Sequence, residues 1–322
     1  MGNEFVIGID LGGTNIVTGI FDCKGELIAR YTRPTGVDKE PSAVLNNMVA
    51  GIEQALQDNS LEWDQIDGIA VGTPGFLNRE AGMVYLAPNL NWENYPLKKE
   101  LGEKTGCTVI LENDANAAIY GEFRKGCARE FSSAVGFTLG TGVGGGIIID
   151  GMIVHGCFDM AAELGHMTID PDGPICGCGN RGCLEAFASA TAVKRYLRDQ
   201  YEPRKDSLIY SLVGHDMEKL SPAVAHQAAL KGDALAIEVL ARTGKYLGIA
   251  TANVINIFNP PVVFFNGGMI HAGDYIMKPL IDEAKKRTIS ASYEKSAIRI
   301  GHLGSDAGLL GIGALAVESF IS

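Results

Sequence analysis

Short apolar runs alternate with glycine-rich turns and amphipathic stretches along most of the chain. Phe5–Ile9 is an apolar run of the strand type that ends at Asp10, and Ile16–Phe21 predicts a second strand. A turn then leads into a third candidate strand, Glu26–Tyr31. Pro41–Asn59 carries apolar residues on one helical face, which predicts an amphipathic helix. The start of the chain therefore predicts a meander of strands followed by a helix.

The same alternation of strand and helix patterns continues to the end of the chain. Ala234–Phe258 predicts a long helix or a helix pair, which Pro260-Pro261 ends. Tyr201–Leu220 shows no clear period and predicts a surface excursion. Further strands are expected at Ile66–Val71, Thr108–Leu111, Val262–Phe265 and Ile298–Ile300, and further helices at Tyr95–Thr105, Ala115–Phe123, Asp274–Arg287 and Asp306–Phe320. Strands that alternate with helices predict an α/β fold, and the hairpins predict mixed rather than purely parallel sheets.

The second half of the chain opens in the same way as the first. Ala134–Gly151 reads as strand, glycine turn, strand and turn, in the order seen from Val6 to Asp22. Coincidence is an alternative, because strand–glycine–strand hairpins are common. The matched Leu-Gly turn and the matched Asp-containing second turn favour an internal repeat.

Composition limits the class of protein. The 322 residues, 46% of them hydrophobic and 20% charged, suggest two domains with an ordinary globular core. The net charge of −11 argues against a nucleic-acid partner, since phosphates would be repelled. The seven cysteines are an odd count, which favours a reducing, cytoplasmic setting. No signal peptide and no membrane-spanning apolar run are expected.

One cluster of residues has metal-ligand spacing. His166, Cys176, Cys178 and Cys183 supply four ligands within 18 positions, the number that a closed tetrahedral zinc site needs. Such a site has no open position for water, so the zinc would hold a loop in shape rather than perform chemistry. The alternatives are a pair of disulfides or ordinary buried thiols. The close spacing of Cys176 and Cys178 and the glycines around them favour zinc.

Two glycine-rich loops follow predicted strands at equivalent places in the repeat. In each, glycines would let the backbone approach a phosphate, and amide groups and a Thr hydroxyl would donate to its oxygens. Asp10 would repel a bare phosphate, so we expect a Mg²⁺ ion between them, bound through water. Neither loop matches the P-loop or the dinucleotide fingerprint, and a plain β-hairpin is the alternative for each. The candidate residues are Asp10, Gly12, Gly13, Thr14 and Asn15 in the first loop and Thr141 and Gly142 in the second.

Three carboxylates are candidates for contact with a substrate. Asp114 follows a predicted strand, where it could accept a proton from an attacking hydroxyl, but it could equally cap the next helix. Asn113 could orient that hydroxyl. Glu163 and Glu185 bracket the metal-ligand cluster, and with His166 they could bind sugar hydroxyls. The alternative is that they only support the metal.

Taken together, these residues resemble the ROK family of sugar kinases and repressors, over a span from Asp10 to Gly313. The most specific part is Glu163-Leu-Gly-His166 with Cys176-x-Cys178-Gly-x-x-Gly-Cys183-x-Glu185. The resemblance implies an α/β fold of the actin-like, hexokinase-like (ribonuclease H-type) class, duplicated into two lobes with mixed sheets and a cleft between them. Residues 1–118, joined by the helix at 305–322, would form the small lobe, and residues 119–304 the large lobe.

The resemblance also implies roles for single residues. ATP and Mg²⁺ would bind in the cleft, with Gly267 and Gly268 in the nucleoside-binding segment, and Asp114 would be the general base toward the sugar 6-hydroxyl. The sugar would be surrounded by Gly75, Asn89, Asn113, Asp114, Glu163, His166 and Glu185. The stretch Ala87-Pro-Asn89-Leu-Asn91-Trp92 is similar to glucokinase members of the family. Members are commonly dimers, which predicts a homo-oligomer. Only Met1–Glu4 precede the first strand, so we expect no winged-helix DNA-binding domain of the repressor type.

The sequence therefore predicts a cytoplasmic, ATP-dependent kinase of carbohydrate metabolism (glycolysis) that converts glucose to glucose 6-phosphate. A related alternative is the same chemistry on N-acetylglucosamine, N-acetylmannosamine, fructose or allose, because a few pocket contacts decide specificity. A more distant alternative is a non-catalytic sugar sensor, or an ATPase of the actin fold whose work is conformational.

Overall fold

The structure is a computed structural model that describes residues 5–37 and 40–321. The chain divides into two compact units. The first comprises the chain up to Glu130, the segment Met152–Ala162 and the chain from Ser305 onward; the second comprises Phe131–Gly151 and Glu163–Gly304. Each unit is described by itself below.

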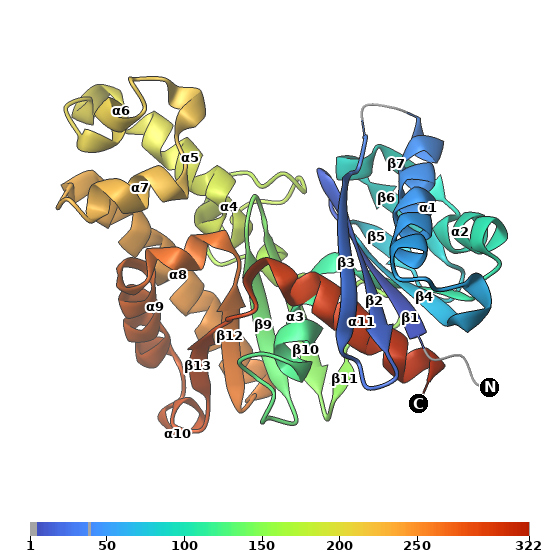
Figure 1. Cartoon of the computed structure of the whole chain (residues 1–322). Helices are drawn as coiled ribbons and strands as arrows, with labels where there is room; N and C mark the ends of the chain where they lie inside the picture. The colour runs from blue at the N-terminus through green and yellow to red at the C-terminus, as the bar shows by residue number, and fades with distance from the viewer. Residues whose placement is uncertain (1–4, 38–39, 322) are drawn as a thin grey trace. The chain divides into compact units, whose positions relative to one another are not determined.

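The first unit is built on a five-stranded mixed sheet with the order β3-β2-β1-β4-β8 (Figure 1). Its strands are β1 (Phe5–Leu11), β2 (Asn15–Asp22), β3 (Leu27–Pro34), β4 (Ile66–Thr73) and β8 (Val109–Asn113). β1, β2 and β3 pair antiparallel, whereas β1, β4 and β8 pair in parallel. The carboxyl ends of the three parallel strands therefore meet at one edge of this sheet.

Helices cover both faces of the first sheet. Successive side chains of β1 point to opposite faces of the sheet. Ile7, Ile9 and Leu11 join the core beneath α1 (Pro41–Asp58) and α2 (Leu97–Thr105). On the other face, Val6 joins the core beneath α3 (Asp114–Arg124) and α11 (Ala307–Phe320).

The chain between β4 and α2 forms a small three-stranded sheet, which the sequence did not predict. It has the order β5-β6-β7, from β5 (Phe76–Asn78), β6 (Met83–Ala87) and β7 (Trp92–Tyr95). Tyr95 was expected in a helix, but it ends β7 and the helix begins at Leu97. Trp92 is almost fully buried and stacks on the Tyr95 ring at 4.4 Å between centroids. This packing overrides the weak local pattern.

The C-terminal helix α11 crosses α3 at close range because glycines face each other at the crossing. A Cβ atom on Gly311 would overlap the carbonyl oxygen of Ala117, and one on Gly121 would overlap that of Ala307. The contact leaves no room for a side chain at either glycine.

Gly311→Ala is expected to destabilise the first unit. Alanine favours the helix by about 1 kcal/mol, but the forced separation of the two helices costs about 3 kcal/mol. The net loss should lower the calorimetric Tm by about 5 °C. Ser319→Ala, on the exposed side of the same helix, is the matched control and should leave the Tm near native. An unchanged Tm for Gly311→Ala would contradict the close crossing.

The second unit repeats the strand order of the first. Its own strands have the order β10-β9-β12-β13, where β9 and β10 pair antiparallel and β9, β12 and β13 pair in parallel. The strands are β9 (Ala134–Leu139), β10 (Val143–Ile149), β12 (Val262–Asn266) and β13 (Ala297–Ile300), while β11 (Met152–Ile153) opens the segment that belongs to the first unit. In both units an antiparallel hairpin is extended by two parallel strands, so the predicted repeat and the mixed α/β fold class are confirmed.

Most helices of the second unit contact a single long helix (Figure 1). Ala234–Phe258 forms one continuous helix, α8, which packs on α9 (Asp274–Arg287). A Cβ on Gly244 would overlap the carbonyl oxygen of Ile276, which explains how closely the two helices approach. The other helices are α4 (Glu185–Ala188), α5 (Ala190–Asp199), α6 (Leu208–Leu212), α7 (Pro222–Ala229) and α10 (Ser290–Tyr293).

Most of the segment Tyr201–Leu220 lies at the surface, as the sequence predicted, but a few of its side chains enter the core. The Tyr210 side chain is fully buried, and its hydroxyl donates to the carbonyl oxygen of Leu197 at 2.6 Å. Ile209 is fully buried too. Short helical turns in this segment have too few residues to show a period.

Seven short 3-10 helices complete the described part of the chain: η1 (Trp63–Gln65), η2 (Pro88–Leu90), η3 (Leu164–His166), η4 (Glu202–Arg204), η5 (Met217–Lys219), η6 (Gly268–Ala272) and η7 (Gly304–Asp306). Among the described residues, none of the helices has the length and apolar character that a membrane span requires.

Candidate functional site

The first glycine loop is a closed turn between β1 and β2. The Gly12 amide donates to the carbonyl oxygen of Asn15 at 2.9 Å, and the Thr35 hydroxyl donates to the Gly12 carbonyl oxygen at 2.6 Å. These bonds use the polar groups of Gly12 inside the turn. Thr14 and Asn15 are exposed at its tip. Thr35 was not singled out in the sequence, since it lies 23 residues further on.

Asp10, the penultimate residue of β1, is closely packed, and its surroundings disfavour the ionised carboxylate. Gly308, in the first turn of α11, packs against its carboxylate, and a Cβ there would lie 2.6 Å from Oδ2. Burial is the main cause that raises the pKa of Asp10 to about 6; the nearby Asp114 carboxylate adds to the rise, and Arg30 opposes it. A cation beside Asp10 would favour its ionised form. The position therefore fits the water-mediated Mg²⁺ contact expected from the sequence.

Asn113, and not Asp114, caps helix α3. The Asn113 Oδ1 accepts the backbone amides of Ala115 at 3.0 Å and Asn116 at 3.2 Å. Asp114 is the first residue of the helix, and its Oδ1 accepts the Ala115 amide at 2.8 Å. Burial raises the pKa of Asp114, and the bonds from backbone amides oppose that rise. Asp114 is therefore available for a role other than capping.

Two other candidate residues lie near the same sheet edge. The Asn113 side-chain amide donates to the Gly75 carbonyl oxygen at 3.4 Å. Gly75 has φ +100°, and a Cβ there would overlap the backbone of Leu86, so only glycine suits this position. Asn89, in η2, lies against Gly13, where a Cβ would be 3.3 Å from the Asn89 Cβ. The first unit thus gathers its candidates at the carboxyl ends of β1, β4 and β8, where open α/β sheets bind ligands.

The second glycine loop, in the second unit, is fastened to the start of α5. The Ala190 amide donates to the Gly140 carbonyl oxygen at 2.9 Å, and the Thr191 hydroxyl donates to the Thr141 carbonyl oxygen at 2.8 Å. Thr141 is exposed and Gly142 is half-buried. Nothing in the sequence pattern pointed to Thr191 as a support for this loop.

The predicted nucleoside segment adjoins the second glycine loop. Gly267 has φ +105°, and a Cβ there would overlap the carbonyl oxygen of Leu139 at the end of β9. Asn266 is buried, and its Oδ1 accepts the Gly267 amide at 2.7 Å. Gly268 has open space around its Cβ position. The ends of β9 and β12 therefore bring Thr141, Gly142, Gly267 and Gly268 into one region of the second unit.

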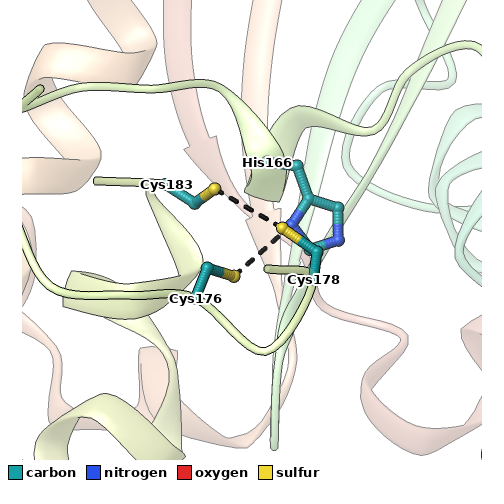
Figure 2. Close-up of side chains that lie close together, drawn as sticks. All are labelled: His166, Cys176, Cys178 and Cys183. Carbon is teal, nitrogen blue, oxygen red and sulfur yellow. Dashed lines mark hydrogen bonds between the residues drawn. The ribbon is translucent and has the colours of Figure 1, made fainter. Parts of the chain in front are cut away.

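The four predicted metal ligands form one cluster (Figure 2). Their ligand atoms all lie within 4.8 Å of one another. Cys176 Sγ is 3.7 Å from His166 Nδ1, and Cys178 Sγ is 3.8 Å from Cys183 Sγ. Ligand atoms at about 2.3 Å from a tetrahedral zinc are about 3.8 Å apart, so the cluster fits that ion.

Disulfides do not explain the cluster. All seven cysteines are free, and the Sγ atoms of Cys178 and Cys183 are 3.8 Å apart rather than the roughly 2.05 Å of a disulfide. Burial raises the pKa of Cys176 to about 12, and the neighbouring thiols of Cys178 and Cys183 add to the rise. The Cys176 thiol therefore resists ionisation without a cation, and a bound cation would favour its thiolate.

The two glutamates that bracket the cluster have different surroundings. Glu185 Oε2 accepts the Val143 amide of the second glycine loop at 3.0 Å, and Oε1 accepts the Cys176 thiol at 3.5 Å. A Cβ on Gly142 would overlap this carboxylate. Glu163 is more exposed, with Oε2 at 4.0 Å from His166 Nε2. Glu185 thus joins the cluster of His166 and the three cysteines to the glycine loop, a connection that the sequence did not reveal.

The α/β fold, with the same sheet pattern in each unit, is that of the actin-like, hexokinase-like class of proteins. The crystal structure of the ROK hexokinase from Thermus thermophilus matches with a TM-score of 0.84 and 31% identity, covering 98% of each chain. That of a ROK family glucokinase from Streptomyces griseus in complex with glucose and AMPPNP matches with a TM-score of 0.81 and 29% identity, covering 98% of this chain and 99% of that one.

Sequence comparison identifies the family. The model of the ROK family matches residues 6–319. A glucokinase from Thermotoga maritima is 37% identical over 314 residues, which covers 97% of each chain. The chain belongs to the ROK family.

Proposed function

We propose that the protein transfers the γ-phosphoryl group of ATP to the 6-hydroxyl of glucose, with Asp114 as the general base. The observation that carries this proposal is the start of α3. Because Asn113 provides the helix cap, the Asp114 carboxylate at the carboxyl end of β8 is not needed for capping. Its pKa is raised by burial, which improves its strength as a base once it is ionised.

The broader class, an ATP-dependent sugar kinase, follows from the relatives. The Thermus thermophilus hexokinase and the glucokinases from Streptomyces griseus and Thermotoga maritima match this chain over nearly its full length. Glucose is the finer part of the proposal, and it rests on the names of two of these relatives and on the Ala87–Trp92 stretch.

In the proposed reaction, Asp114 accepts the proton of the sugar 6-hydroxyl as the hydroxyl oxygen attacks the γ-phosphorus of ATP. The bond between this phosphorus and the oxygen that bridges it to the β-phosphate breaks, and ADP leaves. The bond from the Ala115 amide to Oδ1 fixes the orientation of the carboxylate. The Asn113 side chain bonds both to the Gly75 carbonyl oxygen and to the Ala115 amide in the first turn of α3. It would therefore keep Gly75, a proposed sugar contact, close to the base. Most of the rate enhancement in phosphoryl transfer comes from positioning and charge stabilisation, which suits such a rigid site.

The nucleotide contacts are proposed from the two glycine loops and the nucleoside segment. Mg²⁺, held through water by Asp10, would neutralise charge on the phosphates. In the first loop, the exposed Thr14 is the main candidate to donate a hydrogen bond to a phosphate oxygen, because the Gly12 amide is already bonded within the turn. The proposed contacts are Asp10, Gly12, Gly13, Thr14, Asn15, Thr141, Gly142, Gly267 and Gly268.

The metal cluster would support the sugar contacts. His166 turns Nδ1 toward Cys176, so zinc held by His166, Cys176, Cys178 and Cys183 would leave Nε2 for a sugar hydroxyl. Zinc would supply no chemistry beyond ordering the loop. The proposed sugar contacts are Gly75, Asn89, Asn113, Asp114, Glu163, His166 and Glu185. A dimer remains a prediction from the family resemblance, and a cytoplasmic location remains a prediction from the cysteine count.

A panel of sugars tests the choice of substrate. We expect ADP release, measured by a coupled assay, to have its highest kcat/KM with glucose and lower values with N-acetylglucosamine, N-acetylmannosamine, fructose and allose. A higher kcat/KM with another sugar of the panel would reassign the substrate. ATP hydrolysis at the same rate without any sugar would instead favour a conformational ATPase.

A further inference from the structure

A buried carboxylate that has no part in the proposed reaction lies immediately before Asn113. Glu112 is 1% exposed, and donors surround both of its oxygens. Oε1 accepts the Asn113 amide at 2.9 Å and the Asn116 side-chain amide at 3.0 Å. Oε2 lies 2.8 Å from His155 Nε2 and 3.3 Å from Arg79 Nε.

These partners keep Glu112 ionised. Burial is the largest influence and would raise its pKa, but the hydrogen bond and charge of His155, the charge of Arg79 and the bond from Asn116 outweigh it, so the pKa is lowered. A buried charge with this many partners is strongly held in place, because removing any partner leaves the charge incompletely compensated.

The partners of Oε1 lie on both sides of the proposed base. One partner is the backbone amide of Asn113, the residue that precedes Asp114. The other is the side-chain amide of Asn116, which lies in the first turn of α3. A displacement of the Glu112 carboxylate would therefore displace the backbone that carries Asp114.

The partners of Oε2 fasten a separate segment of the first unit. His155 lies in Met152–Ala162, and its carbonyl oxygen accepts the Ala161 amide at 3.0 Å. The Arg79 amide donates to Asp159 Oδ2 at 2.9 Å, a second attachment of the same segment. This segment leads in sequence directly to Glu163, a proposed sugar contact.

We propose that Glu112 is a positioning residue. One carboxylate oxygen fixes the start of α3, which carries Asp114, and the other fixes the segment 155–161. The proposal rests on the proposed function only in naming Asp114 as the base that is positioned. Glu112 itself touches no substrate; it acts through the residues that it holds.

Glu112→Gln tests the proposal. Gln keeps the size but replaces the carboxylate acceptor by an amide that faces His155 and Arg79 with a donor. We expect kcat to fall by about ten- to a hundredfold, while the KM for glucose changes by less than about threefold. Hydrogen exchange should rise together in peptides that cover residues 113–116 and 155–161, a result that does not depend on activity.

Glu283→Gln is the matched control, since Glu283 is also a buried carboxylate, 7% exposed, with an arginine partner, Arg287, at 2.6 Å. It should leave kcat and KM near native. If Glu112→Gln does not fold, His155→Ala removes a single donor and should still lower kcat by about threefold or more.

A folded Glu112→Gln protein with native kcat and native exchange in both segments would overturn the proposal, as would an equal loss of kcat in the control. If the unmodified protein has no sugar-dependent turnover, the proposed function fails instead, and the exchange of the two segments still decides whether Glu112 holds them.

Discussion

Asp114→Asn is expected to lower kcat by about two powers of ten or more, the usual scale for the loss of a general base. Asparagine keeps the shape and can still accept the Ala115 amide through its side-chain oxygen, so the fold should be preserved. It cannot accept the hydroxyl proton. The KM for ATP should change little, because the nucleotide contacts are proposed elsewhere. The measurement is steady-state kinetics with saturating Mg·ATP.

Asp22→Asn is a suitable control for this experiment. Asp22 is an aspartate of the same unit whose Oδ1 also accepts backbone amides, from Lys24 and Glu26, each at 2.9 Å. Its replacement should leave kcat near native. In the unmodified enzyme, the raised pKa of Asp114 means that the base is protonated as the pH falls, so kcat should decline from a higher pH than an exposed aspartate would give. Native turnover in Asp114→Asn would remove Asp114 from the mechanism.

Loss of the metal cluster should weaken sugar binding far more than nucleotide binding. Purified protein should contain about one zinc per chain by elemental analysis, the loading of a single structural site. Cys178→Ser removes a ligand whose side chain is exposed, so the surrounding core should be little disturbed. We expect the glucose Kd to rise by about tenfold or more, because His166 and Glu185 both depend on this cluster.

Calorimetric titrations of glucose and of a non-hydrolysable ATP analogue measure the two effects separately. Cys23→Ser is the control, since Cys23 is also exposed but lies outside the ligand cluster. Metal-free protein that binds glucose with native affinity would show that the cluster does not order the sugar contacts.

The fold was predictable from the sequence where patterns were long or repeated. Glycine turns after Phe5–Ile9 and within Ala134–Gly151 predicted a duplicated strand–turn–strand unit, and both units have this hairpin. The three-stranded sheet β5-β6-β7 was missed, because its strands are short and Trp92 and Tyr95 are held by stacking rather than by a local preference. Tyr210 was missed for a similar reason, since its burial comes from packing with α5 rather than from a periodic pattern.

The candidate site was predictable where ligands are close in the sequence. The spacing from Cys176 to Cys183 predicted a metal-ligand cluster that the structure brings together. Contacts between residues that are far apart in the sequence were not predictable. Glu185 and Val143, which form a hydrogen bond, are 42 residues apart, and Glu112 and His155 are 43 residues apart. Only the three-dimensional fold brings such pairs together, and it also decides that Asn113 rather than Asp114 caps α3.

Identification of the product tests the central claim most directly. The unmodified protein is incubated with Mg·ATP and glucose, and the products are analysed by phosphorus NMR. We predict glucose 6-phosphate in an amount equal to the ADP formed, and neither product in comparable amount when glucose is left out. ADP with inorganic phosphate in place of a sugar phosphate, or no reaction at all, would contradict the account.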